Sequence, residues 1–168
     1  QTFPAANRLR LAVSKANPQM VGLVASRASN NGMEGVYRSD DLGKSFQNLN
    51  VSQNLLGWQR AGNDNGGQGF YDLAMAISPA NADLWFVGGV NTWRSTNGGS
   101  TWQLSNHWLG DGAPWVHADH HFQYFHPSTG RLYTCNDGGV SYSDNNGTSW
   151  RDMRRAPKTP QYYGLATP

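Results

Sequence analysis

Three copies of one short motif constrain the fold of this chain more than any other feature. Each copy reads Ser-x-Asp/Asn-x-Gly-x-Ser/Thr-aromatic, and the copies begin at Ser39, Ser95 and Ser143. The glycine supplies the positive φ of a tight turn, and the short polar side chains can accept hydrogen bonds from nearby backbone N–H groups. Each copy therefore predicts a β-hairpin. This structural role is assigned to Ser39, Asp41, Gly43, Phe46, Ser95, Asn97, Gly99, Trp102, Ser143, Asn145, Gly147 and Trp150.

The copies belong to a longer repeat. The motifs that begin at Ser95 and Ser143 are 48 residues apart, and the sequences that precede them align without a gap. The first copy matches the second when an eight-residue insertion within 26–35 is allowed. Each repeat reads as four short strands separated by turn residues, and four-stranded units of this period are typical of propeller blades.

We therefore predict an all-β fold: a β-propeller segment of about three four-stranded blades plus the inner strand of a fourth, within a larger propeller. We expect blade 1 at about 8–50, blade 2 at about 69–105, blade 3 at about 117–153 and the start of the next blade at 160–168. Propellers typically have four to eight blades, and an open three-blade fan exposes two apolar sheet faces. We expect the remaining blades to come from missing sequence or from a partner chain.

The repeated motif resembles the Asp-box, or BNR repeat, of β-propellers in sialidases, xyloglucanases and sortilin-type receptors. Further segments are similar to large secreted bacterial proteins, notably of the Bacteroidetes, that carry sortilin-like or glycosyl-hydrolase-like propellers. These segments span 67–73, 87–91, 115–121 and 136–140. The resemblance implies a secreted or cell-surface location, and it specifies the fold more closely than the activity.

Composition narrows the range of partners. The net charge is +2 with 14% charged residues, which gives no signal for nucleic acid or another polyanion. No apolar run is long enough to span a membrane, and the single cysteine, Cys135, excludes a disulfide framework within the chain. We expect polysaccharide or a surface protein as the partner, and neither a cofactor nor a bound metal.

The links between the expected blades, 51–69 and 105–118, are long and irregular. We expect both on the face opposite the motif turns, and variable loops on one face of a rigid scaffold are where binding usually occurs. Aromatic rings can stack on the C–H faces of sugars, while Asn, Asp and His bond hydroxyl groups. The alternative is that the tryptophans fold under and cover the blades. The predicted ligand-binding residues are Trp58, Arg60, Asp64, Trp108, Trp115, His117 and His121.

The segment 115–121, Trp-Val-His-Ala-Asp-His-His, is the densest chemical signal in the chain. It enters the expected inner strand of blade 3, where alternation puts His117, Asp119 and His121 on one face. Three interpretations stay open. The His and Asp side chains could ligate a zinc-like metal, Asp72 and Asp119 could form the carboxylate pair of a glycosidase, or the cluster could be a polar plug that joins the inner strands.

The sequence thus predicts a noncatalytic binding or scaffold module. One alternative is a xyloglucanase-like glycoside hydrolase whose catalytic candidates are Asp72 and Asp119. The other alternative is a purely structural subunit that assembles through exposed blade edges.

Overall fold

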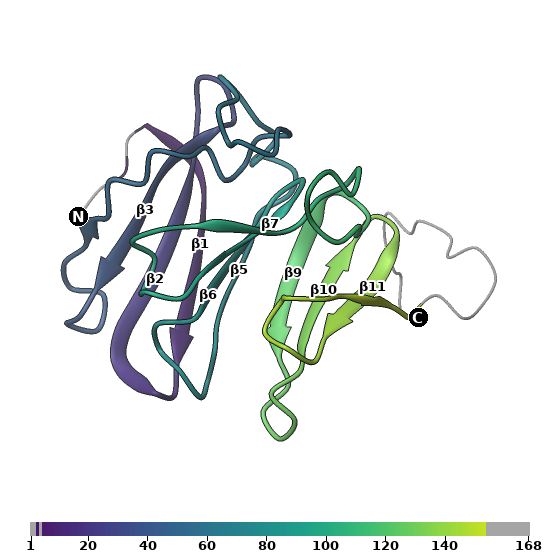
Figure 1. The fold of residues 1–168 in the computed structure, drawn as a ribbon. Coiled ribbons are helices and arrows are strands. Elements are labelled where there is room, and N and C mark those ends of the chain that lie inside the picture. The colour runs from purple at the N-terminus through teal and green to yellow at the C-terminus, as the bar shows by residue number, and fades with distance from the viewer. Residues whose placement is uncertain (1–2, 4, 154–168) are drawn as a thin grey trace, which may run out of the picture.

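The computed structural model describes residue 3 and residues 5–153, and that part of the chain forms strands and loops without a helix. Its strands make three antiparallel sheets of four strands each, which lie side by side (Figure 1). The predicted all-β architecture is therefore confirmed. The inner strand expected at 160–168 lies outside the described residues.

Each sheet is formed by strands that follow one another along the chain. Sheet 1 contains β1 (Ala6–Ser14), β2 (Asn17–Arg27), β3 (Met33–Ser39) and β4 (Gln47–Asn48). Sheet 2 contains β5 (Ala74–Ile77), β6 (Trp85–Gly88), β7 (Thr92–Ser95) and β8 (Gln103–Asn106). Sheet 3 contains β9 (His120–Phe125), β10 (Leu132–Asn136), β11 (Gly139–Ser143) and β12 (Arg151–Asp152).

The three motif turns share one hydrogen-bonding geometry. In each, the first serine hydroxyl accepts the N–H of the motif glycine, at 2.8 Å for Gly43, 3.0 Å for Gly99 and 2.8 Å for Gly147. In each, the Asp or Asn side-chain oxygen accepts the N–H of the seventh motif residue at 2.9 Å. The three glycines have φ of 81°, 88° and 76°, a region that favours glycine because it lacks a Cβ atom. The turns therefore follow from local sequence alone.

Neighbouring sheets pack through apolar side chains that alternate along the strands. Inner strand β5 lies between β1 and β9 (Figure 1). Val24, Trp85 and Trp102 belong to the core between sheets 1 and 2, and Phe86 packs with Phe125 between sheets 2 and 3. Burial of such large apolar groups is the main stabilising contribution.

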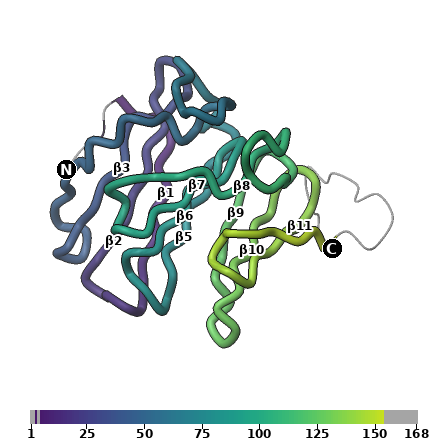
Figure 2. The backbone as a smooth tube through the Cα atoms, in the orientation of Figure 1, coloured from purple at the N-terminus to yellow at the C-terminus, as the bar shows by residue number. Residues whose placement is uncertain are grey.

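The inner strands of the first and last sheets each carry exposed apolar side chains on one face. Leu9, Leu11 and Val13 alternate along β1 with exposed side chains, and Phe122 and Tyr124 do so along β9. These two faces belong to the ends of the row of sheets, because sheet 2 lies between sheets 1 and 3 (Figure 2).

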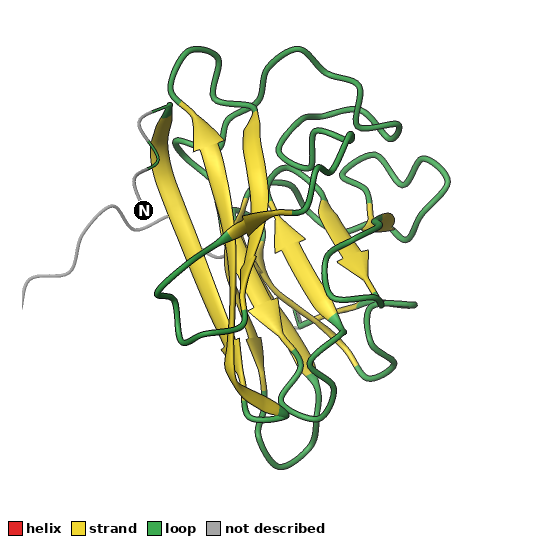
Figure 3. Ribbon diagram, turned by 90° about the vertical axis from the view of Figure 1, so that its left-hand side faces the viewer, coloured by secondary structure: helices red, strands yellow, loops and turns green. Residues whose placement is uncertain are grey.

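The motif turns and the long links occupy opposite ends of the sheets (Figure 3). At one end, backbone bonds join the motif turns to the first hairpin turn of the same sheet, from Leu42 N–H to Gln19 and from Gly98 N–H to Asp83. At the other end, Gly67 N–H bonds Asn30 in the β2–β3 turn. The links 49–73 and 107–119 thus form a loop end. Within the described residues, no helix is long and apolar enough to cross a membrane.

Candidate functional site

A groove of about 380 Å³ opens at the loop end between the two long links. Its walls bring together three of the predicted ligand-binding residues, Trp58, Arg60 and Trp108. The two indole rings are partly accessible, since Trp58 is 40% exposed and Trp108 is 38% exposed. The groove also contains Gln59, His107 and Asp111. We call this set of residues the aromatic groove.

One buried side chain, Asn91 in the turn between β6 and β7, holds both walls of the aromatic groove. Its Nδ2 donates to the carbonyl oxygens of Trp58 at 3.1 Å and Gly57 at 3.4 Å. Its Oδ1 accepts the backbone N–H of Trp108 at 3.1 Å. Asn91 has no exposed surface, so these bonds are shielded from water. The two tryptophans are therefore placed by the scaffold rather than by flexible loops.

The second wall has an additional internal support. His107 is buried, and its Nδ1 accepts the backbone N–H groups of Leu109 at 3.2 Å and Asp111 at 3.4 Å. Because Nδ1 accepts, a neutral imidazole here carries its proton on Nε2. At the rim, Arg60 Nη1 lies 3.6 Å from Asp111 Oδ1 and both side chains are exposed. Water and salt screen that ion pair, so it contributes little to stability.

The other predicted ligand-binding residues have different environments. The Asp64 carboxylate accepts the N–H of Gln59 at 2.8 Å and so shapes the first link. Trp115 is half exposed and pairs with His107 through the backbone, outside the groove lining. His117 and His121 belong to a separate cluster near the inner strands. The structure therefore gathers five of the seven predicted binding residues in two places and leaves Asp64 and Trp115 in the links outside both.

The second place is a carboxyl–histidine cluster formed around the start of β9. Gln68 Nε2 donates to Oδ2 of Asp72 at 3.1 Å and also to Oδ1 of Asp119. Beside them, Asp137 accepts from the Tyr71 hydroxyl at 2.9 Å and lies 2.7 Å from His121 Nε2. Each of these carboxylates thus has protein partners within the described residues.

Burial raises the pKa of both catalytic candidates. Desolvation raises the pKa of Asp72, the Gln68 hydrogen bond opposes this, and the charge of Asp119 raises it further. Desolvation and the charge of Asp137 likewise raise the pKa of Asp119. Asp119 also has a left-handed backbone, with φ of 67°, a conformation that Asp tolerates better than most residues.

Two features of the Asp72–Asp119 pair bear on the glycosidase interpretation. Glycosidase carboxyl groups stand roughly 5–10 Å apart across a site that holds the sugar. Here one amide nitrogen bonds both groups, and Asp72 has no exposed surface to present to a substrate. Of the three interpretations, the polar plug agrees best with these hydrogen bonds. In the described part of the chain, no group of three or more His, Cys, Asp or Glu could hold a metal ion.

His120, the residue that starts β9, joins sheets 2 and 3 through a buried polar network. Its Nδ1 lies 2.7 Å from Thr134 Oγ1 and its Nε2 lies 3.3 Å from Asn106 Oδ1. The same Asn106 oxygen accepts the N–H of Thr92 at 3.0 Å. Complete burial lowers the pKa of His120 to about 3, because the interior disfavours the charged form. At neutral pH the imidazole is neutral and structural.

Sequence reasoning missed two residues that position these groups. Asn91 lies in the segment 87–91, which was noted only for its similarity to other proteins. Gln68 lies in the link 51–69, where the prediction of binding rested on other residues. Both residues form hydrogen bonds with partners that are distant in the sequence. For Asn91 the sequence separation is 17 positions to Trp108 and 33 positions to Trp58. The local signal at Asn91 is a Gly-Gly-Val-Asn turn between two strands, and it does not indicate the partners.

Comparison with known proteins shows the fold. No protein-family model matches the chain, and a search of curated proteins gives no match. A GH74 enzyme of Niastella koreensis superposes with a TM-score of 0.62 at 23% identity, over 92% of this chain and 23% of that chain. The GH74 xyloglucanase from Xanthomonas campestris gives 0.58 at 20% identity, over 92% and 24%. YCF48 from Cyanidioschyzon merolae gives 0.52 at 16%, over 89% and 38%.

The chain spans about a quarter of the length of these two GH74 structures. At such identities the similarity establishes architecture and leaves activity open. Three antiparallel four-stranded sheets, matched to part of larger propellers, identify the chain as a segment with the β-propeller fold.

Proposed function

We propose that the chain is part of a secreted or cell-surface β-propeller that binds polysaccharide noncatalytically through the aromatic groove. The observation that carries this proposal is the convergence of Trp58 and Trp108. They come from two separate links, line one groove of about 380 Å³ and are held by the same buried Asn91. Two partly exposed indoles on backbones that Asn91 fixes are suited to stacking on sugar rings.

The chemistry of the groove favours a neutral glycan. The opposite charges of Arg60 and Asp111 at the rim lie 3.6 Å apart and compensate each other. The rim therefore has no net charge to attract an acidic or basic ligand. Gln59 and Asp111 offer groups that can bond hydroxyls beside the rings. Because two of the structural neighbours are GH74 proteins and one of them is named as a xyloglucanase, xyloglucan is the first probe to use.

The same proposal includes the scaffold. We infer that the three motif hairpins are Asp-boxes, supported by their common Ser–Gly and Asp/Asn–Ser/Thr hydrogen bonds. We also infer that further blades, from the same protein or from a partner, cover the apolar face of β1 and the aromatic face of β9. The exposed side chains of Leu11, Val13, Phe122 and Tyr124 support this.

The test is binding of xyloglucan and a panel of neutral polysaccharides, measured by affinity electrophoresis and calorimetry. Trp58→Ala and Trp108→Ala should each weaken binding about tenfold, taking as the scale the roughly 1–3 kcal/mol that a nucleobase gains by stacking on an aromatic ring. Phe70→Ala is the matched control, because Phe70 is 60% exposed and lies outside the groove lining. Equal weakening by all three variants, or no retention on any glycan, contradicts the proposal.

Enzymatic activity is tested separately. Release of reducing sugar from xyloglucan by the wild-type protein, lost in Asp119→Asn, would replace the noncatalytic assignment with a glycosidase.

A further inference from the structure

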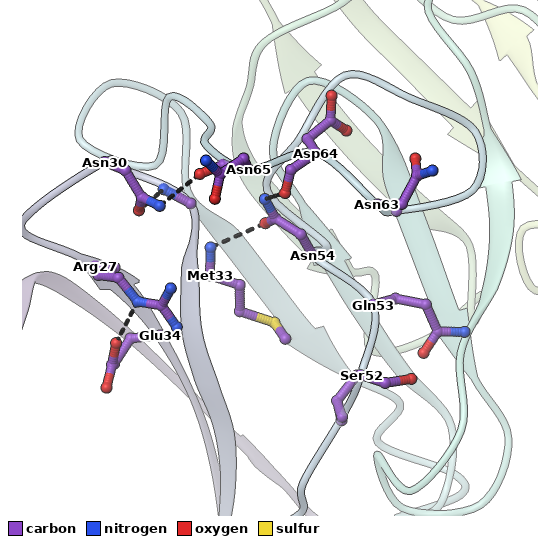
Figure 4. Close-up of a pocket in the computed structure, with 13 residues that line it drawn as sticks. Arg27, Asn30, Met33, Glu34, Ser52, Gln53, Asn54, Asn63, Asp64 and Asn65 are labelled. Atoms are coloured by element: carbon purple, nitrogen blue, oxygen red, sulfur yellow. Dashed lines mark hydrogen bonds and ion pairs between the residues drawn. The ribbon is translucent and has the colours of Figure 1, made fainter.

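A second, polar pocket of about 280 Å³ lies between the β2–β3 hairpin and the first link (Figure 4). The β2–β3 hairpin forms one wall, through Arg27 and Glu34, and the link residues 51–54 and 62–65 form the other. We call it the amide pocket, because Asn and Gln side chains dominate its lining. It shares no lining residue with the aromatic groove.

The inner wall of the amide pocket is rigid. Asn54 Oδ1 accepts the N–H groups of Met33 at 2.9 Å and Leu56 at 3.1 Å. Asn54 Nδ2 donates to the carbonyl oxygens of Asp64 at 3.0 Å and Gly66 at 2.9 Å. Figure 4 shows this side chain between the hairpin and the link. With all its hydrogen-bonding capacity in use, Asn54 forms the wall and leaves ligand contacts to its neighbours.

The rim of the pocket carries hydrogen-bonding groups that the fold does not use. The side chains of Ser52, Asn63 and Asn65 line the pocket and are exposed. Within the described residues, none of these three side chains has a hydrogen-bond partner. One hydroxyl and two primary amides together offer both donors and acceptors, the combination that matches the hydroxyl groups of a sugar.

Charge and size narrow the ligand further. Arg27 Nε lies 2.7 Å from Glu34 Oε2, so the charges at the hairpin wall compensate each other. The volume is close to the lower end of roughly 300–1,000 Å³ seen for small-molecule pockets, which suits one monosaccharide ring. With no exposed indole in its lining, the pocket offers hydrogen bonds in place of stacking.

The two sites share one loop. Residues 58–61 line the aromatic groove and residues 62–65 line the amide pocket, and Asp64 ties this loop to Gln59 at 2.8 Å. We propose that the amide pocket is a second subsite, which takes a neutral sugar unit of the same glycan that stacks in the aromatic groove. This inference rests on the proposed function, and it adds a dependence of affinity on glycan length.

The experiment compares a one-repeat and a two-repeat xyloglucan oligosaccharide by calorimetry. The Ser52→Ala/Asn63→Ala double variant should bind the longer oligosaccharide about tenfold more weakly, since it loses two side-chain hydrogen bonds. It should bind the shorter one as the wild type does, because the short ligand occupies the groove alone. Ser100→Ala, an exposed serine in a motif turn at the opposite end, is the control and should leave both affinities unchanged.

The outcomes separate the two proposals. If Trp58→Ala weakens binding of both oligosaccharides and the double variant weakens binding of neither, the second subsite is overturned and the aromatic groove is kept. Equal weakening of both oligosaccharides by the double variant also overturns the length dependence. As a readout independent of the groove, the side-chain amide NMR signals of Asn63 and Asn65 should shift on addition of millimolar glucose or xylose in Trp58→Ala. Unshifted signals contradict a sugar-binding pocket.

Discussion

Protonation of His120 should control the acid stability of the joint between sheets 2 and 3. The imidazole is completely buried between Thr134 and Asn106, and burial lowers its pKa to about 3. In the unfolded chain the pKa of a histidine is about 6.5. The unfolded state therefore binds a proton as the pH falls through about 6.5, while the folded state does not. The contribution of His120 to the free energy of unfolding is therefore fully present above that pH and is lost progressively below it.

The size of the effect follows from the two pKa values. Between pH 7 and pH 5 the unfolded imidazole takes up most of one proton and the folded one takes up almost none. At about 1.4 kcal/mol per pH unit, the free energy of unfolding should fall by about 2 kcal/mol from this residue alone. Asp72 acts in the opposite direction, because its pKa is raised in the folded state. The effect of His120 must therefore be measured as a difference between proteins.

Urea unfolding of the wild type and of His120→Gln, followed by tryptophan fluorescence at pH 5, 6 and 7, gives that difference. The contribution of Asp72 is common to both proteins, so the wild type should lose about 2 kcal/mol more than the variant between pH 7 and pH 5. His126→Gln, in the turn after β9, is the control and should keep the wild-type dependence on pH. Parallel curves for the wild type and His120→Gln would refute the reasoning. So would an NMR titration of the His120 ring in the folded protein with a midpoint near 6.5.

Three further predictions concern single residues. Asn91→Ala should lower the free energy of unfolding by about 1–3 kcal/mol, because it leaves buried backbone groups without partners; it should also weaken glycan binding, and calorimetry beside urea unfolding measures both. Gly147→Ala should lower the melting temperature more than Gly130→Ala. Both glycines have positive φ, but the new Cβ would lie 2.5 Å from Phe86 at Gly147 and in open space at Gly130; equal melting temperatures contradict this. Asp72→Asn should become more stable relative to the wild type as the pH rises from 5 to 7, because the wild type must hold a proton that its unfolded chain has lost; urea unfolding at both pH values decides the sign.

The hairpins and the sheets could be predicted from the sequence because their determinants are local. In the turn at Ser39, every motif bond joins residues no more than four positions apart. A repeat of such turns with β-forming segments between them leaves few arrangements other than stacked four-stranded sheets. The direction of the links also followed from this order of strands, since in an antiparallel four-stranded sheet the first and third turns lie at one end and the chain enters and leaves at the other.

The roles of individual polar residues depended on contacts that no local pattern records. The carboxylate of Asp64, a predicted ligand-binding residue, accepts a backbone N–H of its own link, a contact that the sequence pattern does not indicate. The two catalytic candidates, Asp72 and Asp119, are bridged by Gln68, which lies 51 positions from Asp119 in the sequence. Burial then decides their charge, and burial is a property of the packed chain.

Residue types and their spacing thus determined the strands, the turns and the end of the molecule where the tryptophans lie. Only the packing of distant segments brought Trp58 and Trp108 into one groove held by Asn91. The same packing enclosed His120 between two sheets. The physical reason is range. A turn is stabilised by neighbours along the chain, whereas a binding groove and a shifted pKa arise from groups that meet only when the sheets pack.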